Sequence, residues 1–459
     1  KDDITVKRII FLILSLALVM TLASCGKKPD TALPPLSGEI TDLASDFVEK
    51  LNTGDFAGAV EFFDTATKKE LPETKLKEVW QTIEQQAGAY QNEVNKKSEE
   101  IGEANMVVIT AQFEQTYLDI RFTFNQNNRI IGLFFVPGQN PTAAYEAPAY
   151  GQPANFTESE VTVSSGKWEL PGTLTIPNGA GPFAAVVLVH GSGPNDRDET
   201  IGTNGTSKPF KDLAWGLANQ GIAVLRYDKR TKVHGQKMAT QNNFTVQEES
   251  IDDAIIAVEL LQQHEHISND HIFVLGHSLG GMLAPRIGAT APKELAGLIM
   301  LAAAARPLED LIVEQSHYLA AVDGTVTEQE AEYIRLIEEQ VAQIKSENLS
   351  PSTPPAEILN VPPAYWLDLR DYKPAELATT LELPMLILQG ERDYQVTMDD
   401  FSIWQDALSS RSDVQCKSYP NLNHLFITGD KPSVPAEYEQ PGNVDKTVID
   451  DIANWIKQR

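Results

Sequence analysis

A serine flanked by glycines is the feature of this sequence with the clearest potential for chemistry. Ser278 lies in the pentapeptide Gly276–Gly280, directly after the apolar and β-branched run Ile272–Leu275. The run predicts a buried strand, and G-x-S-x-G after a strand is typical of a sharp strand-to-helix turn that exposes the serine hydroxyl. The first N–H groups of the following helix would lie near that hydroxyl, where a developing oxyanion needs donors. Ser278 is therefore a candidate nucleophile, although an ordinary glycine-rich turn has the same pattern.

A serine hydroxyl is a weak nucleophile near neutral pH, so Ser278 needs a general base. Where a G-x-S-x-G turn carries the nucleophile, an acid and then a histidine follow it along the chain. Two of the eight histidines, His317 and His424, follow Ser278, and only His424 lies beyond the predicted strand at 383–389. His424 also follows the strand-like stretch Val414–Tyr419, as a base on a loop at a strand end should. We therefore predict His424 as the general base.

The acid that orients His424 should also follow a buried strand. Asp393 lies in the turn Gly390–Val396, directly after the apolar run at 383–389. A carboxylate there can accept the imidazole N–H, fix the histidine tautomer and stabilise the imidazolium. Glu391 is the alternative in the same turn, and we interpret it as a solvated loop charge. Asp393 is the predicted acid.

An oxyanion hole needs a second backbone donor besides the N–H that follows the nucleophile. His190-Gly191-Ser192 directly follows the predicted strand 184–189, and this is the loop that contributes such a donor. We therefore expect the N–H groups of Leu279 and Ser192 to form the oxyanion hole.

An acidic loop at Asn195–Thr200 could be mistaken for a metal site. Hard cations prefer oxygen ligands, but the loop has neither EF-hand spacing nor a histidine cluster nearby. We expect an ion-pair network instead, with Arg226, Asp228 or Arg230 as partners. The sequence predicts no metal site and no cofactor.

The elements that must position these residues alternate between strand and helix from residue 156 to residue 459. Such alternation predicts a mainly parallel α/β sheet. It opens with a hairpin at 160–163 and 168–176, and the strands that follow are predicted at 184–189, 222–227, 272–275, 295–301, 383–389 and 414–419. The predicted helices include 210–220, 246–263 and 444–457.

The alternation stops between about residues 306 and 366. Thr327–Ser346 has a helical pattern with one apolar face, formed by Ala331, Ile334, Ile337, Val341 and Ile344. A helical insertion at this place predicts a cap over an active site. Tyr365 and Trp366 at its end, and His277 beside Ser278, are candidates for lining the substrate pocket. For the two aromatic residues, simple core packing is the alternative.

A smaller domain is predicted at 39–137, followed by a linker at 138–155 rich in Pro, Gly and Ala. Helical patterns at 41–51, 56–63 and 76–87 precede strands at 105–113, 117–125 and 130–136. Helices followed by an antiparallel meander indicate an α+β fold. Neither paired carboxylates nor a histidine constellation is evident there, so we expect a spacer, docking or lid-supporting role.

The N-terminus is typical of a lipoprotein signal peptide at 1–24. Lys7 and Arg8 precede an apolar run at 9–20, and Leu22-Ala23-Ser24-Cys25 then resembles the lipobox of bacterial lipoproteins. The resemblance implies that Cys25 is lipidated and that 25–38 is a tether. We expect an extracytoplasmic lipoprotein, anchored to the membrane of the cell envelope; a plain secreted protein is the alternative.

Composition excludes some classes of function. The chain has 459 residues, 42% of them hydrophobic, and a formal net charge of −27. Such hydrophobic content is ordinary for a globular protein, and the charge argues against nucleic-acid binding, which needs clustered Lys and Arg.

The motifs around Gly191, Ser278 and Asp393 together resemble those of bacterial α/β-hydrolase-fold serine esterases that carry a small N-terminal α+β domain of unknown function, shaped like nuclear transport factors. These esterases are relatives of dienelactone hydrolases and serine aminopeptidases. The resemblance implies an α/β-hydrolase fold and hydrolysis of carboxylic esters, typically with short acyl chains, by a Ser–His–Asp triad without a cofactor. Alternatives are a serine peptidase, thioesterase or deacetylase with the same triad, or a non-catalytic binding lipoprotein, against which the complete triad argues.

Overall fold

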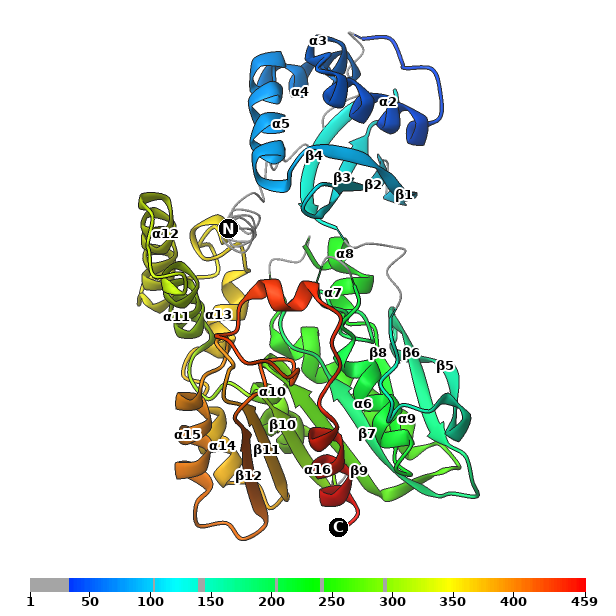
Figure 1. Cartoon of the computed structure of the whole chain (residues 1–459), viewed down its shortest axis with the longest axis vertical. Coiled ribbons are helices and arrows are strands. Elements are labelled where there is room, and N and C mark those ends of the chain that lie inside the picture. The colour runs from blue at the N-terminus through cyan, green and yellow to red at the C-terminus, as the bar shows by residue number, and fades with distance from the viewer. Residues whose placement is uncertain (1–32, 102–103, 139–144, 203–204, 240–242, 292–294) are drawn as a thin grey trace. The chain divides into compact units, whose positions relative to one another are not determined.

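The structure is a computed structural model that describes residues 33–101, 104–138, 145–202, 205–239, 243–291 and 295–459 (Figure 1). The chain divides into two compact units. The first comprises the described parts of 1–144 with 201–206 and 438–440, and the second the described parts of 145–200, 207–437 and 441–459. Cys25, the predicted signal peptide and most of the predicted tether lie outside the described residues.

The first unit has the predicted α+β fold. Its helices are α2 (Ile40–Thr53), α3 (Phe56–Ala59), α4 (Thr65–Glu70) and α5 (Glu73–Ala87), and an antiparallel sheet follows with β1 (Tyr90–Ile101), β2 (Ala104–Phe113), β3 (Tyr117–Phe124) and β4 (Ile130–Pro137) in that order. Phe47 of α2 is fully buried, with its ring centroid 5.6 Å from that of Phe122 on β3. Helices therefore pack on the sheet through aromatic side chains. The short α4 and the polar edge strand β1 were not predicted.

The second unit is built on a mixed sheet of eight strands in the order β12-β11-β10-β9-β7-β8-β6-β5. Their bounds are β5 (Phe156–Ser165), β6 (Trp168–Pro177), β7 (Phe183–Val189), β8 (Ala223–Tyr227), β9 (Ile267–His277), β10 (Gly297–Leu301), β11 (Met385–Gly390) and β12 (Val414–Tyr419). The β5–β6 hairpin and the β6–β8 pair are antiparallel, and the pairs from β8 through β12 are parallel. The predicted opening hairpin and parallel sheet are confirmed.

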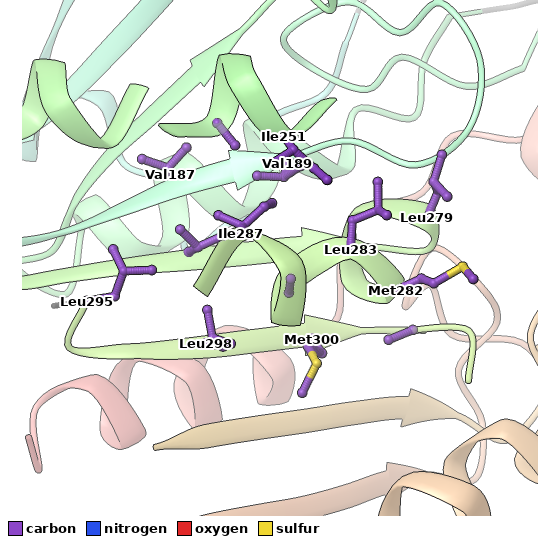
Figure 2. Close-up of a cluster of buried hydrophobic side chains, with 14 of the residues drawn as sticks. Val187, Val189, Ile251, Leu279, Met282, Leu283, Ile287, Leu295, Leu298 and Met300 are labelled. Atoms are coloured by element: carbon purple, nitrogen blue, oxygen red, sulfur yellow. The ribbon is translucent and has the colours of Figure 1, made fainter. Parts of the chain in front are cut away.

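Helices cover both faces of this sheet. One face carries α9 (Asp252–Gln262), α10 (Leu279–Thr290), α14 (Pro374–Thr379) and α15 (Met398–Leu408), and the other α6 (Pro209–Ala218) and α16 (Lys446–Ile456). Figure 2 shows Met282, Leu283 and Ile287 of α10 among side chains of β7 and β10. Packing against several strands holds the start of α10 at the carboxyl end of the sheet.

The predicted helical insertion lies between β10 and β11. It contains α11 (Leu308–Ala321), α12 (Glu328–Lys345) and α13 (Pro363–Leu369), with a small core of its own formed by Ile344, Leu349, Ile358 and Trp366. Thr327 and Glu330 form a reciprocal capping box at the start of α12. Ala331 is exposed, in contrast to the prediction for this helix, while the other predicted apolar positions are buried.

The second half of the predicted linker is not a free connection. The Tyr145 hydroxyl donates to Asp212 on α6 at 2.5 Å, and the Tyr150 hydroxyl donates to the Val444 carbonyl at 2.6 Å. Residues 145–155 therefore belong to the second unit, because their aromatic side chains pack on its helices.

None of the helices in the described residues combines the length and hydropathy that a membrane crossing requires.

Candidate active site

Ser278 lies in a strained turn between β9 and α10. Its backbone adopts φ 54° and ψ −117°, which is unusual for a residue with a side chain. The turn is closed on both sides, because its N–H donates to the Leu301 carbonyl and its carbonyl accepts from Met282, both at 2.9 Å. A Cβ at Gly276 would overlap the Gly280 carbonyl, and one at Gly280 would overlap the carbonyl of Val189. Both glycines are therefore required by contact with backbone.

His424 and Asp393 meet in the interior, at the ends of β12 and β11. Nδ1 of His424 lies 2.6 Å from Oδ2 of Asp393, and the two residues are 4% and 5% exposed. The other oxygen of Asp393 accepts the N–H groups of Gln395 at 2.7 Å and Val396 at 3.0 Å. The Gln389 amide also donates to Oδ2 at 3.2 Å. These four contacts hold the carboxylate with one oxygen toward the imidazole.

The loop that carries His424 is fixed by its neighbour Asn423. The Asn423 side-chain oxygen accepts the N–H groups of Leu425 at 3.0 Å and Ile427 at 3.1 Å, and its amide donates to Glu437 at 3.1 Å. No hydrogen bond joins the Ser278 hydroxyl to His424 in the described structure. Catalytic hydrogen bonds are often long before substrate binds.

The loop after β7 lies against the serine turn. A Cβ at Gly191 would stand 3.1 Å from the Cβ of Ser278, so the backbones pass each other closely. Among the described residues, no acceptor takes the N–H of Ser192 or that of Leu279. The structure thus brings both predicted donors to the carboxyl edge of the sheet, free to bind an oxyanion.

The comparison with protein families identifies the larger unit. A family described as serine aminopeptidase, S33 matches residues 181–431, which include Ser278, Asp393 and His424. The chain belongs to this hydrolase family. A family of proteins of unknown function, DUF3887, matches residues 44–133 in the first unit. The predicted resemblance to α/β-hydrolases with a small N-terminal domain is therefore confirmed.

A relative with a named activity is similar over most of the chain. Esterase EstD of Thermotoga maritima is 39% identical over 411 residues, which are 89% of this chain and 93% of that protein. Solved structures with similarity include an esterase of Pyrococcus furiosus, with 16% identity, a TM-score of 0.42 and coverage of 70% of this chain and 97% of that one. Est1E from Butyrivibrio proteoclasticus has 14% identity, a TM-score of 0.40 and coverage of 65% and 96%.

His277, the residue before Ser278, contacts the loop that carries His424. In this S33-family chain it is buried, with Nε2 2.9 Å from the His424 carbonyl and Nδ1 3.0 Å from Oε2 of Glu199. Burial lowers the pKa of His277, but the Glu199 carboxylate outweighs burial and holds that pKa above its usual range. Through its two ring nitrogens His277 links the histidine loop to the acidic loop, while its predicted part in the substrate pocket stays a prediction.

Tyr365 and Trp366 occupy the packed interior. The Tyr365 hydroxyl donates to Oε2 of Glu249 at 2.8 Å, and the Trp366 indole N–H donates to the Ile358 carbonyl at 3.0 Å. They are 7% and 3% exposed. Their burial fits the alternative interpretation, core aromatics, while a role of Tyr365 and Trp366 in lining the substrate pocket stays a prediction.

The acidic loop forms the expected ion pairs. Arg197 contacts Asp228 at 3.1 Å and Glu160 at 2.7 Å, and Arg226 pairs with Asp198 and Glu158. Arg230 does not join this network, because it pairs with the buried Asp253 of α9 at 2.5 Å. No group of His, Cys, Asp or Glu in the described ranges is arranged to hold a metal ion.

Two buried charged residues beside the site were not singled out by the sequence reasoning. Glu199, 2% exposed, bonds the N–H of Gly191 at 3.0 Å, and Lys229, also 2% exposed, bonds the carbonyl of the same residue at 2.8 Å. Glu199 is one acid among several in its loop, and no local pattern distinguishes it. Lys229 lies directly after a predicted strand on the edge that carries the site, which is the one signal that could have found it.

Proposed function

We propose that this S33-family hydrolase is a carboxylesterase that acts on esters with short acyl chains, with Ser278 as nucleophile, His424 as base and Asp393 as acid. The observation that carries the proposal is the 2.6 Å contact between His424 Nδ1 and Asp393, beside a serine in a strained turn. The similarity to an esterase over 89% of the chain supports ester substrates. The small-acyl preference comes from the resemblance described above.

The geometry suits acyl transfer in two steps. Because Asp393 accepts the Nδ1 proton, the lone pair of His424 is on Nε2, where it takes the proton of the Ser278 hydroxyl as the oxygen attacks the ester carbonyl. The oxyanion accepts the N–H groups of Leu279 and Ser192. Collapse breaks the ester C–O bond, and His424 returns its proton to the departing alcohol. Water then attacks the acyl-enzyme carbonyl while His424 takes its proton. The bond to the Ser278 oxygen breaks, His424 returns the proton to that oxygen, and the acid leaves.

Replacement of Ser278 tests this function. Ser278→Ala should lower hydrolysis of p-nitrophenyl butyrate by roughly 10⁴-fold or more, because a triad acts as a unit. Ser316→Ala is the matched control, since Ser316 is a buried serine whose hydroxyl bonds a carbonyl within its own helix. A fluorophosphonate probe should label wild-type Ser278, as mass spectrometry of the peptide would show. Full turnover by Ser278→Ala would remove Ser278 from the mechanism, and absence of an adduct would favour a binding protein.

A serine peptidase is the second candidate, because the matching family is described by an aminopeptidase. The same triad can cleave amides, and a fold does not set its substrate. A panel of p-nitrophenyl esters with acyl chains from acetyl to octanoyl, set against aminoacyl p-nitroanilides, distinguishes the two. We expect the highest kcat/KM for the short esters; faster cleavage of an anilide would make the chain a peptidase.

We further propose that the protein is an extracytoplasmic lipoprotein anchored through Cys25. The support is the sequence alone: Lys7 and Arg8, an apolar run and then Leu22-Ala23-Ser24-Cys25. In bacteria that express the full chain, wild type should incorporate labelled palmitate and sediment with membranes. Cys25→Ala should do neither, and labelling of that variant would contradict the assignment.

A further inference from the structure

Gly191 is held from both sides by buried charges. Its N–H donates to Oε1 of Glu199 at 3.0 Å, and its carbonyl accepts from Nζ of Lys229 at 2.8 Å. Both side chains are 2% exposed. Buried charges occur where a strong and specific contact offsets the loss of water. Here both contacts converge on one residue of the loop that faces Ser278.

The hydrogen bond from Lys229 affects the orientation of the peptide group between Gly191 and Ser192. The Gly191 carbonyl and the Ser192 N–H belong to one planar, trans peptide group, so they point in opposite directions. The carbonyl accepts from Lys229 at 2.8 Å and also from the Asn195 amide at 3.3 Å. The shorter bond from the charged Lys229 is the stronger of the two, so it contributes most to the direction of the Ser192 N–H. The ammonium also polarises the peptide group, which makes this N–H a stronger donor.

Lys229 has a counter-charge that anchors it from the far side. Oε1 of Glu249 lies 3.0 Å from Nζ, and Oε2 of Glu249 accepts the Tyr365 hydroxyl at 2.8 Å. Glu249 lies in the π-helical segment η3 (Gln247–Ile251) that precedes α9. This irregular turn, of a kind frequent at functional sites, brings Glu249 within reach of Lys229.

Arg230, the residue after Lys229, is a buried cation whose ion pair does not involve the loop after β7. Arg230 is also buried and pairs with Asp253 at 2.5 Å. Among the described residues, its guanidinium donates hydrogen bonds to that carboxylate and not to the loop. The two adjacent buried cations thus differ in their side-chain contact with the loop. Lys229 bonds the loop that passes Ser278, and Arg230 does not.

We propose that Lys229 is a positioning residue of the oxyanion hole, which aims the Ser192 N–H at the reacting carbonyl by holding the Gly191 carbonyl from behind. The inference rests on the proposed function, because it assigns a role in the same acyl transfer. Lys229 does not touch substrate. It acts through the Gly191–Ser192 peptide group, opposite the bond from Glu199.

The test uses Lys229→Met in the full chain, with p-nitrophenyl butyrate as substrate. Loss of one aligned donor should lower kcat by about 10²-fold, with KM changed less than about threefold. A trifluoromethyl ketone analogue of the ester, whose hemiketal oxyanion occupies the same hole, should lose affinity in proportion to kcat/KM. A purely structural role would lower the melting temperature and leave both quantities unchanged in the folded enzyme.

Two further variants keep the proposal falsifiable. The double variant Lys229→Met with Glu249→Gln removes the buried ammonium together with its counter-charge. No unpaired carboxylate is left at position 249, and we expect the same loss of kcat as in Lys229→Met. Arg230→Met is the matched control, which should lower stability and retain wild-type kcat and inhibitor affinity. Wild-type kcat and ketone affinity in the folded double variant would overturn the role of Lys229. Absence of a fluorophosphonate adduct in the wild type would instead overturn the proposed function itself.

Discussion

At the scale of single residues, the candidate site depends on positions where backbone approaches backbone. Gly276, Gly280 and Gly191 all pass so near to another segment that a side chain would meet a carbonyl or Ser278. Ser278 itself has a left-handed φ of 54°. Such strain persists only where the surroundings enforce it. The turn, the loop after β7 and the start of α10 therefore constrain one another.

Substitution of Gly280 should disturb both stability and activity. The added Cβ of Gly280→Ala would overlap the Val189 carbonyl and approach the His190 carbonyl to 2.7 Å. Neither backbone can yield without moving the oxyanion loop, so we expect a loss of about 3 kcal/mol in unfolding free energy and a strong fall in kcat. Gly235→Ala is the control, because a Cβ there meets nothing within 4 Å. Urea unfolding measures the unfolding free energy, and ester hydrolysis measures kcat. A Gly280→Ala protein with the same stability and kcat as Gly235→Ala would refute the close-contact argument.

His190 should make stability depend on pH. Burial lowers its pKa from 6.5 to about 4. As pH falls through 6.5, the unfolded chain binds a proton that the folded protein takes up only near pH 4, so stability falls with pH across this window. The loss is about 1.4 kcal/mol per pH unit. His190→Gln should lose less stability between about pH 7 and about pH 4 in urea titrations; parallel curves for both proteins would contradict a buried neutral imidazole.

At the scale of elements, the sheet edge and the insertion have separate supports. The strands β7, β9, β11 and β12 end at one edge and deliver the loop, the serine, the acid and the histidine. Parallel strands present their carboxyl ends together, which is why residues far apart in sequence can meet there. The insertion has its own small cluster around Trp366.

Replacement of Trp366 tests whether it is a core residue. In the wild type, the Trp366 indole N–H donates to the Ile358 carbonyl at 3.0 Å. Trp366→Phe keeps an aromatic ring but leaves that carbonyl without a donor. We expect a loss of about 1–3 kcal/mol in unfolding free energy and unchanged KM for esters of every acyl length. A shift in acyl-length preference would place Trp366 at the substrate after all.

At the scale of the whole molecule, each unit has a core of its own. The first is built around Phe47 and its aromatic neighbours, and the second on the two faces of the large sheet. Ser278, Asp393, His424 and Lys229 all belong to the second unit. The chemistry proposed for the site therefore draws its residues from one unit.

A cavity in each core should have different consequences. Phe47→Ala should destabilise the first unit by about 3–5 kcal/mol, since the ring is fully buried. Hydrolysis of p-nitrophenyl butyrate at room temperature should keep its kcat and KM. Phe210→Ala, an equally buried ring on α6, is the contrasting variant and should reduce activity on warming. Differential scanning calorimetry measures the unfolding of the two units, and ester hydrolysis measures activity. Loss of kcat in folded Phe47→Ala would show that the first unit contributes to catalysis.

Elements with strong periodicity could be predicted from sequence, and those without it could not. The apolar strands β7, β9 and β11 are buried on both faces and are evident as continuous apolar runs. The strand β1 pairs only with β2 at a sheet edge, and its polar residues carry no alternation that would reveal it. The helix α15 is an exception, because it was not predicted although its buried Phe401, Trp404 and Leu408 recur at helical spacing.

The type and order of the chemical groups could be inferred from local sequence patterns. Glycines at 276 and 280 define a turn by local geometry, and His424 is the histidine that follows the last acid-bearing strand, so both could be identified without coordinates. The burial of Glu199, Lys229 and His277, and that of Tyr365 and Trp366, could be seen only in three dimensions. Desolvation and charge pairing depend on segments that meet in space, and Lys229 bonds Gly191 across 38 positions of sequence.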